Sequence, residues 1–253
     1  MNELEAWWAT DLTHITPGTI TLRGRPIQDL IGSTSFVQIL WLLLRGDLPQ
    51  PREAALLEAA LVAGVDHGTQ APSIAGARMA ATCGVGLNNA IANGVNVLGD
   101  IHGGAGQQCV EILLRIDSRR AEAGLKPAVA AELEQLRYVP GFGHRFHPVD
   151  PRREPLLRLV EEAALDSTVE GRHLEAAKEI EEQLNAGRDR PVPMNIDGAT
   201  AVIYAELGFP APLARGFFVL SRSVGILAPR LGGDPTGTPH QRPPAARLYR
   251  IAV

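Results

Sequence analysis

The sequence has few cysteines, no long apolar run and no strong excess of one charge. Two cysteines, Cys83 and Cys109, are too few for a disulfide framework. The longest strongly apolar run, residues 36–44, is far shorter than the roughly 20 residues that a membrane-spanning helix needs. The 24 Lys and Arg against 28 Asp and Glu give a net charge of -4, which argues against a basic nucleic-acid-binding surface. The acidic N-terminus lacks a signal-peptide pattern, so we expect a cytoplasmic protein without membrane or nucleic-acid partners.

Strand patterns are scarce as well. Only residues 13–27 alternate between apolar and polar side chains, around Pro17-Gly18, and they predict a small β-hairpin. Apolar residues elsewhere recur at helical spacing. The sequence therefore predicts a mostly α fold, with no internal repeat and an irregular tail over residues 232–244.

Helix boundaries can be expected from capping residues, glycine and proline. Ser33, Thr34 or Ser35 can cap a first helix, and Ser167-x-x-Glu170 fits a capping box that opens a later one. The expected helices cover residues 36–44, 51–64, 74–98 (as one or two helices), 103–113, 167–187, 199–207 and 213–227.

Glycine and proline are more frequent than usual, at 26 and 19 residues. Many of them flank titratable side chains in four stretches that interrupt the helical pattern. Glycine at such boundaries lets backbone approach a ligand closely. The four stretches are Asp66-His67-Gly68, His102-Gly103-Gly104-Ala105, residues 141–145 with Asp150-Pro151-Arg152, and Asn195-Ile196-Asp197-Gly198.

Each stretch alone has an ordinary structural explanation. His102 before two glycines is typical of a cap or a hydrogen-bonded buried histidine, and Asp197 could be the N-cap of the helix that follows. His144 and His147 are three residues apart, but no Cys or acidic partner completes a metal site, so we expect no metal. Gly84-x-Gly86 lacks the remainder of a dinucleotide-binding fingerprint.

Together and in this order, the four stretches resemble the citrate synthase family. That family has an HGGA motif, a G-x-GH motif followed by DPR, and an aspartate in an N-V-D motif. The resemblance implies a helical fold with a large domain (residues 1–102 and 201–253) and a small domain (residues 103–200). It also implies catalytic roles for His102, His144 and Asp197.

The same resemblance implies a reaction between a CoA thioester and a keto acid. Asp197 would be the carboxylate that exchanges a proton with the acetyl methyl group, His102 would donate to the thioester oxygen, and His144 would serve the keto carbonyl. Oxaloacetate would bind through a second set of residues: His67, Arg152, Arg222 and Arg242. Coenzyme A would contact a third set: Val139, Gly141, Phe142, Gly143 and Arg145. No permanently bound cofactor is expected, because the CoA thioester is a substrate.

The spacing favours one branch of this family. Pro49 and His67 are only 18 residues apart, where ordinary citrate synthases carry a long helical segment. This compaction resembles the short citryl-CoA lyases and the C-terminal module of ATP-citrate lyase, so the predicted reaction is cleavage of citryl-CoA to acetyl-CoA and oxaloacetate. Citrate synthase, a 2-methylcitrate-type enzyme and a silent CoA- or dicarboxylate-binding paralogue remain alternatives. The small-residue helices and Arg242, which would reach the other subunit's site, predict a homodimer or a higher homo-oligomer.

Overall fold

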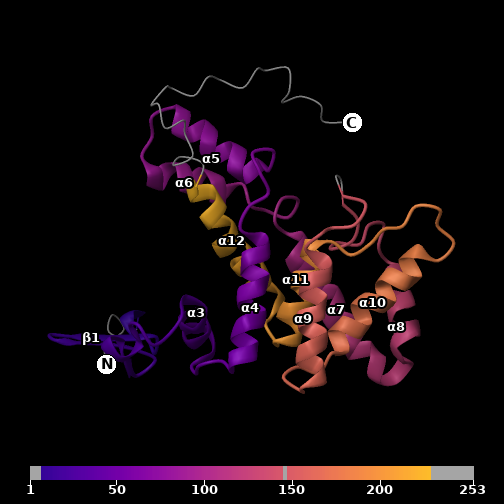
Figure 1. The fold of residues 1–253 in the computed structure, drawn as a ribbon, viewed down its shortest axis with the longest axis horizontal. Helices are drawn as coiled ribbons and strands as arrows, with labels where there is room; N and C mark the ends of the chain where they lie inside the picture. The colour runs from indigo at the N-terminus through magenta and orange to yellow at the C-terminus, as the bar shows by residue number, and fades with distance from the viewer. Residues whose placement is uncertain (1–6, 145–146, 229–253) are drawn as a thin grey trace.

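The computed structural model describes residues 7–144 and 147–228, and these form a mostly helical molecule with a small N-terminal sheet (Figure 1). A mostly α fold is therefore confirmed. The strands are β1 (Thr13–Thr16), β2 (Thr19–Leu22) and β3 (Arg25–Pro26). The helices are α2 (Ile27–Leu30), α3 (Phe36–Arg45), α4 (Pro51–Gly64), α5 (Pro72–Thr82), α6 (Leu87–Asn96), α7 (Ala105–Ala123), α8 (Leu125–Leu133), α9 (Arg153–Leu165), α10 (Arg172–Asn185), α11 (Ile196–Glu206) and α12 (Ala211–Leu227).

The N-terminal sheet contains the predicted hairpin and one further strand. β1 and β2 are antiparallel, with Thr16 opposite Thr19 across the turn. β3 adds only two residues to the edge of β2, too few for an alternating pattern to reveal. In Figure 1 the sheet and α3 extend to one side of the main helical body.

The first predicted helix begins and ends where its capping residues indicate. Ser35 accepts a hydrogen bond from the Gln38 amide, and the Gln38 side chain accepts one from the Ser35 amide, which makes a capping box. Gly46 ends α3 in the left-handed conformation, with φ of 92°. α4 starts at Pro51, as expected for a proline in the first helical turn.

The capping box predicted at Ser167 and Glu170 is wrong. α10 begins only at Arg172, and Ser167 has a left-handed φ of 62° in the turn after α9. The Glu206 carboxylate, at the end of α11, instead accepts hydrogen bonds from the amides of Gly171, His173 and Leu174, at 2.7 to 3.0 Å. A charged acceptor from a distant part of the chain thus replaces the local cap, and it also suits the positive end of the α10 dipole.

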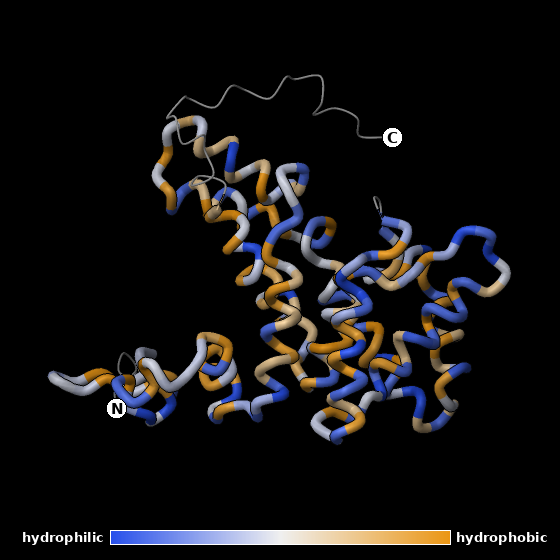
Figure 2. Tube along the Cα trace, in the orientation of Figure 1, coloured by the Kyte–Doolittle hydropathy of each residue, from blue (hydrophilic) through white to orange (hydrophobic). Residues whose placement is uncertain are grey.

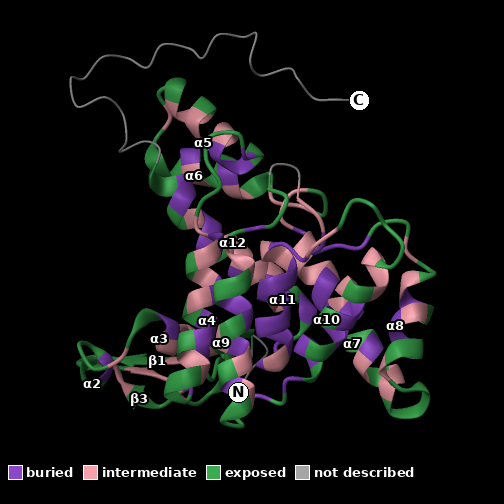
Figure 3. Cartoon of the chain, turned by 45° about the vertical axis from the view of Figure 1, so that its right-hand side comes forward, coloured by how far each residue is buried: buried purple, intermediate pink, exposed green. Residues whose placement is uncertain are grey.

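α11 occupies the centre of the main body. Its residues from Gly198 to Ala205 are all buried, and the helix packs against α4, α7, α9 and α10. Figure 3 shows this central helix largely buried, and Figure 2 shows apolar and polar positions alternating along the helices around it. The residues at the start of α11 are therefore held on a rigid, enclosed element.

α5, α6 and the far end of α12 form a smaller unit beside this core. Ala71, Ile74, Ala77 and Ile226 make a separate apolar cluster there. The stretch predicted as one or two helices is two, α5 and α6, which pack closely through small residues. No helix within the described ranges has the length and apolarity to cross a bilayer.

Candidate active site

Two extended segments bring the third and fourth glycine-containing stretches together. The Gly143 amide donates to the Pro193 carbonyl at 2.7 Å, and the Asn195 amide donates to the Gly141 carbonyl at 2.9 Å. The Asn195 side chain also donates to the Gly143 carbonyl at 2.6 Å. Gly141 has φ of 88°, and a Cβ there would lie 2.8 Å from the Gly198 Cα, so only glycine permits this close approach. This pairing places the segment that leads to His144 against the start of α11.

Asp197 lies in the first turn of α11, but it is not the N-cap. Asn195 is the N-cap, because its side-chain oxygen accepts the amides of Asp197 and Gly198 at 2.8 and 3.3 Å. The Asp197 carboxylate is thus not used in capping. Burial raises its pKa, and the positive charges of Arg152 and Arg222 oppose this shift. A carboxyl with a raised pKa at the end of a buried helix is suited to exchanging a proton with a substrate.

His102 lies in the loop before α7 and is held by Ser73 on α5. The Ser73 amide donates to His102 Nε2 at 3.1 Å, and the Ser73 hydroxyl lies 3.0 Å from the same nitrogen. Since a backbone amide can only donate, Nε2 is the acceptor, and a neutral His102 carries its proton on Nδ1. Burial lowers the pKa of His102, and the charge of Arg222 adds to the effect. His102 is therefore neutral near pH 7, with Nδ1–H as a donor.

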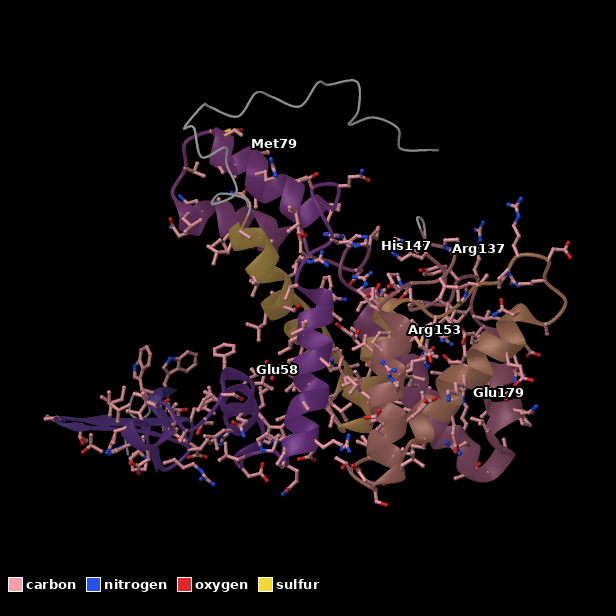
Figure 4. All side chains as sticks on the ribbon, in the orientation of Figure 1. Glu58, Met79, Arg137, His147, Arg153 and Glu179 are labelled. Carbon is pink, nitrogen blue, oxygen red and sulfur yellow. The ribbon has the colours of Figure 1, made fainter. Side chains whose placement is uncertain are left out.

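His144 forms a small aromatic group with two other histidines. Its ring centroid lies 5.7 Å from that of His67 and 4.7 Å from that of His147, and the His147 amide donates to His144 Nδ1 at 3.1 Å. Figure 4 shows His147 near the end of α4 and the start of α9. Burial lowers the pKa of His144, although the charge of Asp150 opposes this, and burial with the Arg152 and Arg222 charges lowers the pKa of His67. Within the described residues no group of His, Cys, Asp and Glu is arranged to hold a metal ion.

Arg152 is bound by the buried carboxylate of Asp150, for which the motif pattern predicts no role. Arg152 Nε and Nη2 donate to the two Asp150 oxygens, each at 2.9 Å, and Nη1 donates to the Ala63 carbonyl at 3.3 Å. The Asp150 carboxylate also accepts the Ile196 amide at 3.1 Å, one residue before Asp197. Burial raises the pKa of Asp150, but the Arg152 hydrogen bonds and charge outweigh it and lower the pKa to about 2. These contacts take the Nε hydrogen and one hydrogen on each of Nη1 and Nη2, so one hydrogen on each of these two nitrogens, the outer Nη pair, is left to donate to a ligand carboxylate.

Arg222 on α12 is almost fully buried, with 4% of its surface exposed. Its Nε donates to the Gly64 carbonyl at 3.0 Å, and its guanidinium lies 4.8 Å from the centre of the Phe218 ring. The last carbonyls of α4 therefore hold both arginines, since Arg152 uses Ala63 and Arg222 uses Gly64. Unpaired carbonyls at a helix C-terminus favour cations.

The structure thus places most of the predicted catalytic and dicarboxylate-binding residues around one region. The Arg222 charge shifts the pKa values of His67, His102 and Asp197, and the Arg152 charge shifts those of His67, His144 and Asp197. Arg145 and Arg242 lie outside the described residues. Asp150, Asn195 and Ser73 are the partners that sequence reasoning missed; only the polar letters beside the predicted residues could have indicated them.

Two of the residues predicted to contact coenzyme A, Val139 and Phe142, line a surface cavity of about 590 Å³. Val139 and Phe142 form part of its wall with Arg137, Arg188 and Tyr138. The Val139 and Phe142 side chains are themselves buried, and Gly141 and Gly143 are held by the pairing with residues 193–195. Because glycine has no side chain, Gly141 and Gly143 could contact a ligand only through backbone atoms.

Comparisons with known proteins agree with this arrangement. Residues 49–234 match the family described as citrate synthase, C-terminal domain. Citrate synthase from Haloferax volcanii is 28% identical over 189 residues, which cover 74% of this chain and 48% of that protein. The chain spans about half the length of the curated relatives it matches.

Two solved structures share the fold over nearly the whole chain. Citryl-CoA lyase from Hydrogenobacter thermophilus superposes with a TM-score of 0.81 at 33% identity, covering 95% of this chain and 92% of that one. ATP citrate lyase from Methanothrix soehngenii superposes with a TM-score of 0.76 at 19% identity, covering 98% of this chain and 45% of that one. The sequence match and the shared fold together show that the chain belongs to the citrate synthase family.

Proposed function

We propose that this protein cleaves citryl-CoA to acetyl-CoA and oxaloacetate. The observation that carries the proposal is the similarity to the citryl-CoA lyase of Hydrogenobacter thermophilus, at 33% identity over nearly the full length of both chains. The short connection between α4 and α5, which brings His67 directly after α4, also supports it. The citrate synthases that match the sequence make synthesis of citrate from acetyl-CoA and oxaloacetate the second candidate.

The two arginines account for binding of the dicarboxylate part of the substrate. The outer Nη pair of Arg152 and the Nη atoms of Arg222 would each bind one carboxylate in bidentate fashion. His67, whose ring lies beside that of His144, would add a hydrogen bond. Arg242 is assigned to the same ligand only by the family resemblance.

The three catalytic residues account for breaking the carbon–carbon bond. His144 takes the proton of the citryl hydroxyl, and the oxygen forms the keto group of oxaloacetate as the bond to the CH2 carbon breaks. The electron pair of that bond passes to the thioester as an enolate, whose oxygen receives a hydrogen bond from His102 Nδ1. Asp197, protonated at the start, then gives its proton to the CH2 carbon and completes the methyl group of acetyl-CoA. The raised pKa of Asp197 suits this role as an acid.

Coenzyme A would lie along residues 139–143, with Arg145 near its phosphates. We also propose that residues 103–200 form a small domain that closes over the substrate on the larger remainder. The protein would hold no permanent cofactor, since its CoA thioester is consumed or produced.

Two incubations test the activity. Synthetic citryl-CoA should yield acetyl-CoA and oxaloacetate without free thiol, while acetyl-CoA with oxaloacetate should release no free CoA. Release of free CoA from the second mixture would identify a synthase instead. Absence of reaction in both mixtures, with oxaloacetate still binding in calorimetry, would support a silent paralogue and refute both enzyme assignments. Asp197→Asn is the control that must abolish any true turnover.

A homodimer remains a proposal. Several apolar side chains on α5, on α12 and in the loop after α6 are exposed in the single chain, among them Met79, Val224, Val97 and Ile101. Such a surface is typical of an interface between subunits. Light scattering that gives the mass of one chain at micromolar concentration would contradict it.

A further inference from the structure

The segment that leads to Asp197 is hydrogen-bonded along both of its edges. On one edge, Pro193 and Asn195 pair with the loop of residues 141–143. On the other edge, the Val192 amide donates to the Asn185 side chain at 2.6 Å and the Met194 amide donates to Glu181 at 2.7 Å. Alternate amides of an extended segment point the same way, and Glu181 and Asn185 lie four residues apart on one face of α10. The helix therefore takes the place of a neighbouring strand.

Glu181 also binds the start of α9. Its second carboxylate oxygen accepts a hydrogen bond from the Arg153 guanidinium, and this ion pair is largely screened from water, with 18% of the Glu181 side chain exposed. Arg153 directly follows Arg152, and Met194 lies three residues before Asp197. Figure 4 shows Arg153 between α9 and α10.

This arrangement repeats the one around Asp150. Asp150 bridges Arg152 and the Ile196 amide, and Glu181 bridges the next arginine and the Met194 amide. Two carboxylates, Asp150 and Glu181, thus each connect residues 152–153 with residues 194–196. With one bridge alone, the segments could rotate about it, whereas two bridges fix both their separation and their angle.

We propose that Glu181 is a positioning residue for both Arg152 and Asp197. It touches neither substrate nor reacting atoms, and it acts by fixing the dicarboxylate-binding arginine relative to the proton-exchanging carboxyl. The inference rests on the proposed function for its catalytic consequence, but its structural part, the clamping of residues 192–197, does not depend on it.

Glu181→Gln tests the proposal, with Glu179→Gln as the matched control. Glu179 is a buried carboxylate on the same helix, hydrogen-bonded to Gln183 and facing Lys126 of α8, away from the site. Because small misplacements of reacting groups cost up to about a hundredfold in rate, and Asp150 remains in place, we expect Glu181→Gln to lower kcat about tenfold. We also expect the Kd for oxaloacetate to rise and amide hydrogen exchange in residues 192–197 to accelerate. Glu179→Gln should lower the melting temperature comparably but leave kcat, Kd and that exchange within about twofold.

A double-mutant cycle separates positioning from general loosening. Arg153→Gln should reproduce the kinetic effect, and the Arg153→Gln/Glu181→Gln double variant should be no worse than either single variant, because the pair acts as one unit. Equal kinetics, binding and exchange in the Glu181 and Glu179 variants would overturn the proposal. A wild-type protein that turns over neither substrate mixture would refute the proposed function but not the clamping of residues 192–197. That clamping would be refuted by Glu181→Gln if amide hydrogen exchange in residues 192–197 stayed as in wild type.

Discussion

Replacing Asp150 by asparagine should cost both stability and catalysis, since this buried carboxylate holds the Arg152 guanidinium and the Ile196 amide. The pKa of Asp150 is lowered from 3.8 to about 2, and this shift corresponds to about 2 kcal/mol of preferential stabilisation of the charged form in the folded state. Asp150→Asn should therefore lower the free energy of unfolding at pH 7 by about 2 kcal/mol or more, because it also leaves Arg152 without its counter-charge.

The stability effect has a defined pH dependence. Because the folded-state pKa is depressed, the stabilisation is fully present above the unfolded-state pKa and is lost as the pH falls through the folded-state value. Urea unfolding should show a constant gap between wild type and Asp150→Asn from pH 7 to pH 5, and a narrowing gap below about pH 4. A gap of the same size at pH 3 and pH 7 would refute the electrostatic reasoning.

The catalytic effect of Asp150→Asn needs a control variant that loses a buried ion pair far from the candidate site. Glu132 is a second buried carboxylate bound by two arginines, Arg115 and Arg119, and it lies on α8. We expect Glu132→Gln to be destabilised as well but to keep its KM and kcat, whereas Asp150→Asn should raise KM about tenfold or more and lower kcat. Unchanged kinetics in Asp150→Asn would show that Asp150 does not organise the site.

Three further predictions follow from the site. Asp197→Asn should abolish turnover while oxaloacetate still binds in calorimetry; in wild type, kcat for cleavage should depend on pH as a bell, because His144 must be deprotonated and Asp197 protonated, and a rate without a fall on the alkaline side would contradict the role of Asp197 as an acid. His102→Ala should lower kcat about a hundredfold or more, as loss of an oxyanion donor does, whereas Ser73→Ala keeps the backbone bond to Nε2 and should cost under about tenfold in steady-state assays. Gly141→Ala should lower the unfolding free energy by about 3 kcal/mol or more in a urea titration, because its Cβ would lie 2.8 Å from the α11 backbone. Gly187 is also left-handed but has open space around it, so Gly187→Ala should lower the unfolding free energy by only about 1 kcal/mol.

Local signals predicted the fold where a residue acts on its own neighbours. Ser35, Gly46 and Pro51 set helix boundaries within a turn of themselves, so their letters are enough. The prediction at Ser167 was wrong because the α10 cap is Glu206, more than 30 residues away in sequence. Neither α8 nor α9 was among the predicted helices, although α9 buries Leu156 and Val160 at helical spacing.

The candidate site divides in the same way. The order of the short motifs along a single sequence was enough to name four candidate residues: His102, His144, Arg152 and Asp197. Asp150 was visible only as the first letter of a DPR stretch, and its role depends on an amide 46 residues away. The assignment of the N-cap to Asn195 rather than Asp197 likewise depends on where the side-chain oxygen lies, which spacing alone does not determine.

The shared anchoring of Arg152 and Arg222 on the last carbonyls of α4 has a consequence for small anions. Each guanidinium is already partly neutralised, by the helix end and, for Arg152, by Asp150. A chloride or acetate ion would therefore gain little by entering, while a ligand with two carboxylates can satisfy both outer faces at once. We therefore expect ordinary salt to compete only weakly with the substrate for Arg152 and Arg222. The distance between the two carboxylates of a ligand would then determine which ligand binds.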